Sequence, residues 1–381
     1  MGKLKKIIVG SVTIATFLSP IAAIEVYNNE EKKTKVDIYG SIRAYVGMGS
    51  NSYVGDVKGI FGLQTNSRFG ISVKYGNLTS TIEFGAQEPS LFGKGNEQID
   101  ALGLRQIWGA YSFGKAGTLL VGKKDSPSVG KGFSSDIFDN DNGATGFGSI
   151  RNSNRVMQVE YSVAGTQIAL VQDELPFVRE KYSSIPRLAL AYSLKKDTFE
   201  MKVGGSYKFI QPGDTGTANR FSGAGNAFHV FLGAKANLLD KKLFLSGIVH
   251  TGINADIYGE QRTNVNTGGF TFAHTRLDNQ INTLAIDNQI FRSGALIELG
   301  YKISSDVMAI LAVGYQATTF SKISHVAIHG YSVMGQVPIK IQKRFIITPQ
   351  VSWYQTTATS QDTSILVGDG LMAFVQLRYD F

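Results

Sequence analysis

The chain has 381 residues, a formal net charge of +8, 43% hydrophobic residues and no cysteine. A helical membrane protein needs several apolar runs of about 20 residues, so this composition excludes that class. The absence of cysteine excludes disulfides and thiolate metal sites. There is no dense Lys/Arg run beyond residue 6 and no nucleic-acid motif, so we expect no nucleic-acid partner.

The first residues are typical of an export signal. MGKLKK is basic, and the apolar stretch IIVGSVTIATFLSPIAAI follows it. This order predicts a signal peptide over residues 1–23, removed after Ala23. The alternative is a single membrane anchor, which Pro20 disfavours because it interrupts a run that is barely long enough.

The segment VDIYGSIRAYVG, residues 36–47, alternates two kinds of side chain. Ile38, Ile42 and Val46 fall on one face, while Tyr39 and Arg43 fall on the other. Successive side chains of a strand point to opposite faces, so the pattern predicts a strand with one apolar face. The same alternation predicts further strands at 68–76, 79–87, 105–114, 118–124, 155–163, 166–174, 187–194, 198–210, 227–238, 243–253, 292–303, 307–320, 325–337, 344–357 and 370–381.

The connections between these sixteen segments alternate in length. Tight turns rich in Gly, Asn and Asp follow every second strand. Most other connections are long and polar: 47–66, 88–104, 125–153, 174–186, 211–225, 255–290 and 358–369. Short turns at one rim and long loops at the other are typical of outer-membrane barrels, and an open sheet edge in lipid would leave backbone groups unpaired. We therefore predict an all-β fold, a closed 16-stranded antiparallel transmembrane β-barrel.

Two strands add detail to this prediction. In VMAILAVGYQ, residues 307–316, both faces are apolar or small, so either a loop covers the inner face or another subunit covers the outer face. In the last strand, Leu377, Tyr379 and Phe381 alternate with polar residues. Its apolar face is expected to meet lipid, and its backbone to pair with the first strand.

VDIYGSIRAYVG, RNSNRVMQVEYS and the terminal LRYDF together resemble the general bacterial porins of the Gram-negative outer membrane. The resemblance implies a barrel over 24–381 and a third long loop, about 125–153, folded inward. It implies a homotrimer surrounded by outer-membrane lipid and lipopolysaccharide. Tyr379 and Phe381 resemble the terminal signal that the outer-membrane assembly machinery recognises. The implied function is a water-filled channel for passive diffusion of small hydrophilic solutes and ions.

In such porins a ladder of arginines faces acidic residues on the inward-folded loop. Arg68, Arg105 and Arg151 match basic positions of the family, and Arg43 is a further inward candidate. The acidic candidates are Asp136, Asp139 and Asp141. The Pro-Glu-Phe-Gly-Gly-Asp stretch of enteric porins is absent, which leaves the acid positions and the ion preference open.

Other chemistry finds little support in the sequence. DNDNG, residues 139–143, is similar to part of a calcium loop but lacks the remaining acidic ligands, so we expect turn chemistry and no cofactor. The alternative is a divalent cation near Asp139 and Asp141. His325 and His329 are about 13 Å apart on a strand, too far for one metal. No GxSxG elbow is present, and we expect no enzyme.

Two other functions remain open. A substrate-specific channel for sugars or anions would need an aromatic or basic lining. A surface adhesin or structural barrel would use its long loops, of which 255–290 is the longest, to bind other molecules.

Overall fold

The computed structural model describes residues 23–51, 57–64, 66–87, 101–133, 137, 146–173, 185–210, 223–261, 265–267, 270–272, 288–360 and 363–381. Apart from Ala23, the predicted signal peptide lies outside them. Within these ranges, no helix has both the length and the apolar character needed to span a membrane.

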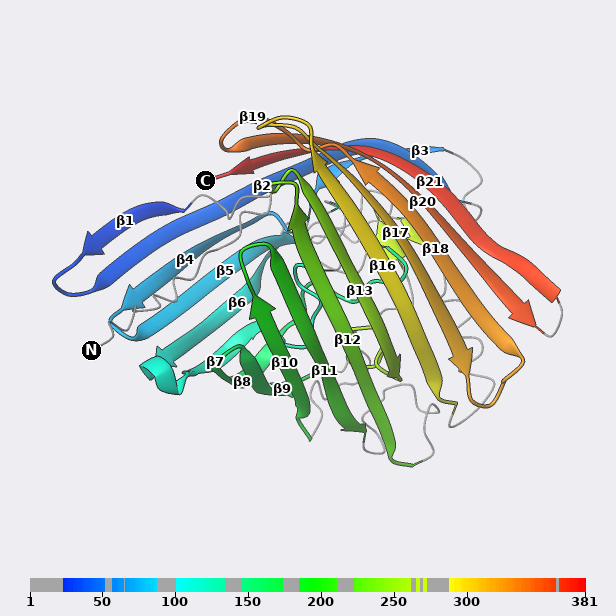
Figure 1. Ribbon diagram of the computed structural model, residues 1–381, viewed down its shortest axis with the longest axis horizontal. Helices are drawn as coiled ribbons and strands as arrows, with labels where there is room; N and C mark the ends of the chain where they lie inside the picture. The colour runs from blue at the N-terminus through cyan, green and yellow to red at the C-terminus, as the bar shows by residue number, and fades with distance from the viewer. Residues whose placement is uncertain are drawn as a thin grey trace, which may run out of the picture.

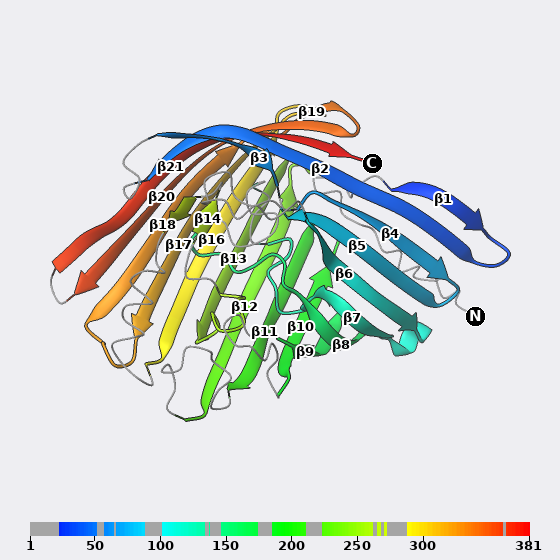
Figure 2. The ribbon, with the colours of Figure 1, turned by 180° about the vertical axis from the view of Figure 1, so that it is seen from behind.

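Sixteen strands form a closed antiparallel barrel, which confirms the predicted fold class. Each strand pairs with the next, and β2 pairs with β21 from Ser41↔Asp380 to Asn51↔Gly370. Figures 1 and 2 show this closure from opposite sides, with red β21 beside blue β2. The strands are β2 (Thr34–Asn51), β4 (Arg68–Tyr75), β5 (Leu78–Gln87), β6 (Ala101–Ser112), β7 (Thr118–Asp125), β8 (Arg155–Val163), β9 (Thr166–Gln172), β10 (Arg187–Lys195), β11 (Phe199–Ile210), β12 (Gly225–Leu238), β13 (Leu243–Ile253), β16 (Ile290–Lys302), β17 (Met308–Phe320), β18 (Val326–Gln336), β20 (Phe345–Ser360) and β21 (Thr363–Asp380).

Two smaller strands extend the barrel sheet: β3 (Lys58–Leu63) pairs with β2, and β19 (Ile339–Gln342) pairs with β20. β14 (Val265–Thr267) and β15 (Phe270–Phe272) pair with each other in a separate two-stranded sheet. The 3₁₀ turn η1 (Gly114–Ala116) precedes β7.

Besides β3, β14, β15 and β19, the structure contains one more strand that the sequence did not predict, β1 (Ile24–Asn29), which pairs with β2. β2 extends past the end of β21, and β1 covers the edge that would otherwise stay unpaired.

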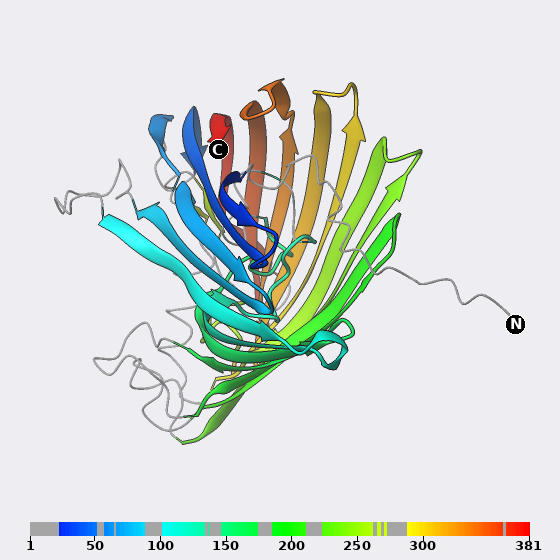
Figure 3. The same ribbon diagram turned by 90° about the vertical axis from the view of Figure 1, so that its left-hand side faces the viewer.

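Side chains alternate between an apolar outer face and a largely polar inner face. On β17, Leu311 and Val313 are each 50% exposed, while Gln316 and Thr318 are buried. This is the reverse of a soluble protein, in which buried residues are apolar. Figure 3 shows the strands curved around a common interior. The outer surface therefore suits lipid.

The seam between β2 and β21 is completed by the last residue. The backbone N–H of Phe381 donates to the carbonyl of Gly40 at 3.0 Å, and the N–H of Gly40 donates to the carbonyl of Phe381 at 2.8 Å. The Phe381 ring lies where a side chain at position 40 would project. Glycine at this position lets the terminal aromatic ring pack on the strand.

Candidate functional site

Three of the predicted basic residues lie on the inner wall. Arg43 on β2 is 3% exposed, Arg105 on β6 is 8% exposed, and Arg68 begins β4. Their strands are neighbours through β4 and β5, and their charges lie close enough to interact. The strand alternation places them together because each occupies an inward position.

Glu83 on β5 is the carboxylate of this wall. Its Oε1 accepts hydrogen bonds from Arg105 Nε at 2.8 Å and Gln106 Nε2 at 3.2 Å. Its Oε2 accepts one from the Tyr39 hydroxyl at 3.1 Å and lies 3.6 Å from Arg68 Nε. A buried carboxylate is stable here because every nearby donor is directed at it.

Two more arginines join this wall, and the sequence-based prediction omitted both. Arg378 on β21 lies directly opposite Arg43 and is paired with Asp380 at 2.8 Å. Arg155 begins β8, 3.8 Å from Asp125. Arg378 was already on the polar face of the last predicted strand, so the alternation alone was enough to find it.

The other predicted site residues have different positions. Arg151 precedes β8 and donates through Nη1 to Asn154 Oδ1 at 3.0 Å. Asp136, Asp139 and Asp141 lie outside the described residues, as does the proposed cation site. Elsewhere in the described chain, no group of three or more His, Cys, Asp or Glu residues is arranged to hold a metal.

The described parts of the segment between β7 and β8, residues 126–133 and 146–154, pack on inward-facing strand residues. The carbonyl of Phe147 lies against Gly314 of β17, and its ring packs edge-on against Tyr354 of β20. Ile150 is fully buried in the same apolar cluster. The inner face of β17, whose small and apolar side chains had two possible explanations, is therefore covered from within the chain.

An open cavity of about 320 Å³ lies between residues 126–133 and the wall formed by β6, β7 and β9 to β11. Its lining includes Lys124, Lys131 and Lys202, together with Asp125 and Glu200. Space next to charged side chains in the barrel interior is suited to water and polar solutes.

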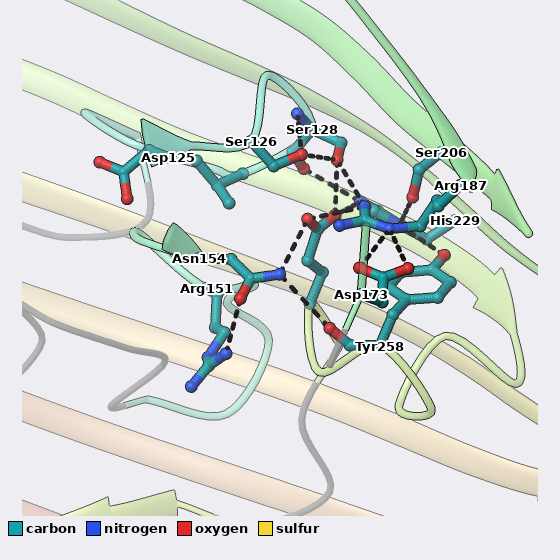
Figure 4. A network of polar contacts seen from close by, with 12 residues as sticks. Asp125, Ser126, Ser128, Arg151, Asn154, Asp173, Arg187, Ser206, His229 and Tyr258 are labelled. Atoms are coloured by element: carbon teal, nitrogen blue, oxygen red, sulfur yellow. Dashed lines mark hydrogen bonds and ion pairs between the residues drawn. The ribbon is translucent and has the colours of Figure 1, made fainter. Parts of the chain in front are cut away.

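A second polar cluster lies on the opposite side of residues 126–154, and Figure 4 shows it. Arg187, at the start of β10, has no exposed surface. Its Nε donates to both Asp173 oxygens at 2.9 and 3.0 Å, and its Nη1 donates to Glu260 Oε1 at 2.8 Å. The guanidinium also stacks 4.5 Å from the Tyr258 ring.

Glu260 is equally buried and lies after β13, outside the strands. Burial alone would raise the pKa of its carboxyl, but the Arg187 charge and hydrogen bonds from Ser128 and Asn154 lower that pKa to about 2. The carboxylate is therefore ionised at neutral pH.

No family model and no curated protein sequence matches this chain. Solved structures do match. The outer membrane channel DcaP of Acinetobacter baumannii superimposes with a TM-score of 0.62 at 15% identity, over 93% of this chain and 99% of that one. An anion-selective porin from Comamonas acidovorans gives 0.60 at 14% identity, over 91% and 100%. The trimer form of OmpT, an outer membrane protein of Vibrio cholerae, gives 0.54 at 12% identity, over 91% and 99%. The chain therefore has the fold of bacterial outer-membrane porins and channels.

Proposed function

We propose that the chain forms a water-filled channel in the bacterial outer membrane, through which small hydrophilic solutes and ions diffuse passively. One observation carries this proposal: the sixteen-stranded barrel is closed, apolar outside and charged inside. A barrel of this size is too wide for its side chains to fill, so a lumen remains. The solved structures of similar fold include an outer membrane channel and an anion-selective porin.

Such a channel would select solutes by their size and polarity. Residues 126–154 would narrow the lumen, and the arginine wall would order water across it. A polar solute exchanges hydrogen bonds with that water, whereas an apolar solute displaces ordered water without compensation.

The charge balance of the wall favours a preference for anions as a second, more specific function. Among the residues that the structure describes, five arginines on this side of the interior are accompanied by three carboxylates that pair with members of the group: Arg43, Arg68, Arg105, Arg155 and Arg378 with Glu83, Asp125 and Asp380. Anions entering this part of the lumen would be attracted, within the screening distance of about 8 Å at physiological salt.

We further propose that the channel assembles as a homotrimer in lipid and lipopolysaccharide. The trimer form of OmpT, a protein of similar fold, supports this assembly. The many exposed apolar side chains on the outer face are suited to lipid or to a neighbouring subunit.

Planar-bilayer recording of the refolded protein under a salt gradient tests the function. We expect stepwise openings, grouped in threes for a trimer, with a reversal potential on the anion-selective side. A barrel that folds by circular dichroism and never conducts would overturn the channel. A cation-selective reversal potential would overturn the anion preference alone.

A further inference from the structure

In addition to the segment between β7 and β8, the segment directly after β13 lies in the barrel interior. It comprises residues 254–261, and we call it the strap. Its first residue is fixed to the wall: Asn254 Nδ2 donates to the carbonyl of Asn226 at 2.9 Å, and Asn254 Oδ1 accepts from the N–H of Ile290 at 2.9 Å. Ala255 and Tyr258 then pack against Ile210 and Ala227. The strap is thus a rigid insertion held by its neighbouring strands.

Near the end of the strap, Glu260 contacts both ends of residues 126–154. Its Oε2 accepts from the Ser128 hydroxyl at 2.6 Å, and its Oε1 accepts from Asn154 Nδ2 at 3.2 Å. Its own carbonyl accepts from the N–H of Arg151 at 3.1 Å. The segment leaves and rejoins the wall at these residues, so Glu260 holds it on both sides.

The wall fixes Glu260 in turn. Arg187 Nη1 on β10 donates to Oε1 at 2.8 Å, and Nε2 of His229 on β12 lies 3.4 Å from Oε2. In the neutral His229 ring, Nε2 carries the hydrogen, because its closest partner is the Ser128 carbonyl at 3.0 Å, an acceptor. Nδ1 then accepts from the Tyr258 hydroxyl at 2.9 Å. The hydrogen bonds from Arg187, Ser128 and Asn154 therefore hold the Glu260 carboxylate in one orientation.

Breaking this arrangement would weaken the contacts that hold the ends of the segment. Losing the negative charge of Glu260 leaves the Arg187 guanidinium paired with Asp173, and it removes the charged acceptor of the Ser128 hydroxyl and the Asn154 amide. A hydrogen bond to a charged group is stronger than one between neutral groups, so both ends of the segment would be held less tightly. The position of residues 126–133 and 146–154 therefore depends on the Glu260 side chain.

We propose that Glu260 is a positioning residue that holds residues 126–133 and 146–154 against the wall and thereby sets the aperture of the channel. The inference rests on the proposed channel function and deepens it, since it names the group that holds these residues in place.

A thiol probe tests the position of the segment without requiring conduction. The native chain has no cysteine, and Val129 is 1% exposed. Val129→Cys therefore provides one buried thiol in the segment, whose reaction with a maleimide reports local opening. Adding Glu260→Gln should speed labelling at least about tenfold, the change expected when one charged hydrogen bond is lost. The matched control is Glu30→Gln, the same chemical change in an exposed turn.

Bilayer recording gives the second readout. Glu260→Gln should lower the open-channel conductance and add fluctuations between levels, because a segment released from the wall moves into the lumen, whereas Glu30→Gln should change neither. Ser128→Ala removes the hydroxyl that donates to Glu260 and that also bonds to Ser126 and Arg187, while the Glu260 charge stays, so it should give a smaller change of the same sign. This variant keeps the test valid if Glu260→Gln fails to fold.

The two readouts separate the two proposals. Faster labelling in a protein that never conducts would support the positioning role and overturn the channel. Unchanged labelling and conductance in Glu260→Gln, with a normal channel in the unmodified protein, would overturn the positioning role.

Discussion

Arg105 on β6 donates through Nε to Glu83 Oε1 on β5 at 2.8 Å, while Arg68 Nε lies 3.6 Å from the other carboxylate oxygen. One carboxylate thus offsets part of the charge of two guanidinium groups. Glu83→Gln should shift the reversal potential toward anions. The expected change in the permeability ratio is about fourfold, since a unit charge at about 5 Å in water interacts by about 0.8 kcal/mol. Glu30→Gln provides the matched control, and an unchanged reversal potential would place Glu83 away from the ion path.

Gly314 lets Phe147 of the segment lie close to the wall. The carbonyl of Phe147 lies where a side chain at 314 would begin. Gly314→Val should therefore push this part of the segment toward the lumen, with overpacking of about 1–3 kcal/mol. We expect a changed conductance with the barrel retained on gels and by circular dichroism. Gly109, which has open space around it, is the control position; equal behaviour of Gly109→Val would contradict the close contact.

The strap should make the channel sensitive to acid only at low pH. The ordinary pKa of a Glu carboxyl, 4.5, is lowered to about 2 at Glu260, with Arg187, Asp173, His229 and Tyr258 facing it. A lowered folded-state pKa contributes stability that is complete above about 4.5 and is lost as the pH falls toward 2. Labelling of Val129→Cys and conductance should therefore stay constant from pH 7 to about 5, and below about 4 the labelling should rise and the conductance fall. If the rise in labelling were complete by pH 5.5, a group other than Glu260 would control the position of the segment.

The last residue should matter for the seam. Removing Phe381 deletes two backbone hydrogen bonds with Gly40 and the ring that covers this glycine. We expect a loss of about 1–3 kcal/mol of stability, seen as a lower temperature for the heat-induced gel shift of the folded barrel. Phe381→Tyr, which keeps the ring and the backbone, should behave like the unmodified protein. Equal melting of the truncated chain would mean that the seam is held elsewhere.

The strands were predictable because side chains of a strand alternate between two faces, and one face meets lipid. The sequence of each strand therefore alternates between apolar and polar residues. Leu311 and Val313 outside, with Gln316 and Thr318 inside, follow directly from that alternation. The arginine wall was predictable for the same reason, since Arg43, Arg68 and Arg105 occupy inward positions. The omission of Arg378 came from relying on family positions although the alternation already marked it.

The cluster around Glu260 was not predictable from local sequence. Glu260 lies in a loop, where no period fixes the direction of a side chain, and its partners Ser128 and Arg187 are 132 and 73 residues away. A single glutamate in a polar loop has the same appearance whether it is solvated or buried. β1 was missed for a related reason: the need to cover the edge of β2 depends on where β21 ends, which is a long-range property.

β1 and β21 occupy the same edge of β2, one after the other. Phe381 is bonded opposite Gly40, and Ile24 lies opposite Ile38, so the edge passes from one end of the described chain to the other with one position between them. As far as the sheet is concerned, the two strands are a single strand with a gap in its covalent backbone. That gap is arbitrary: a short linker joining residue 381 to residue 24, with new ends cut into a long loop, would leave every strand pair intact. The order of strands in the barrel is therefore circular, although the polypeptide that forms it is linear.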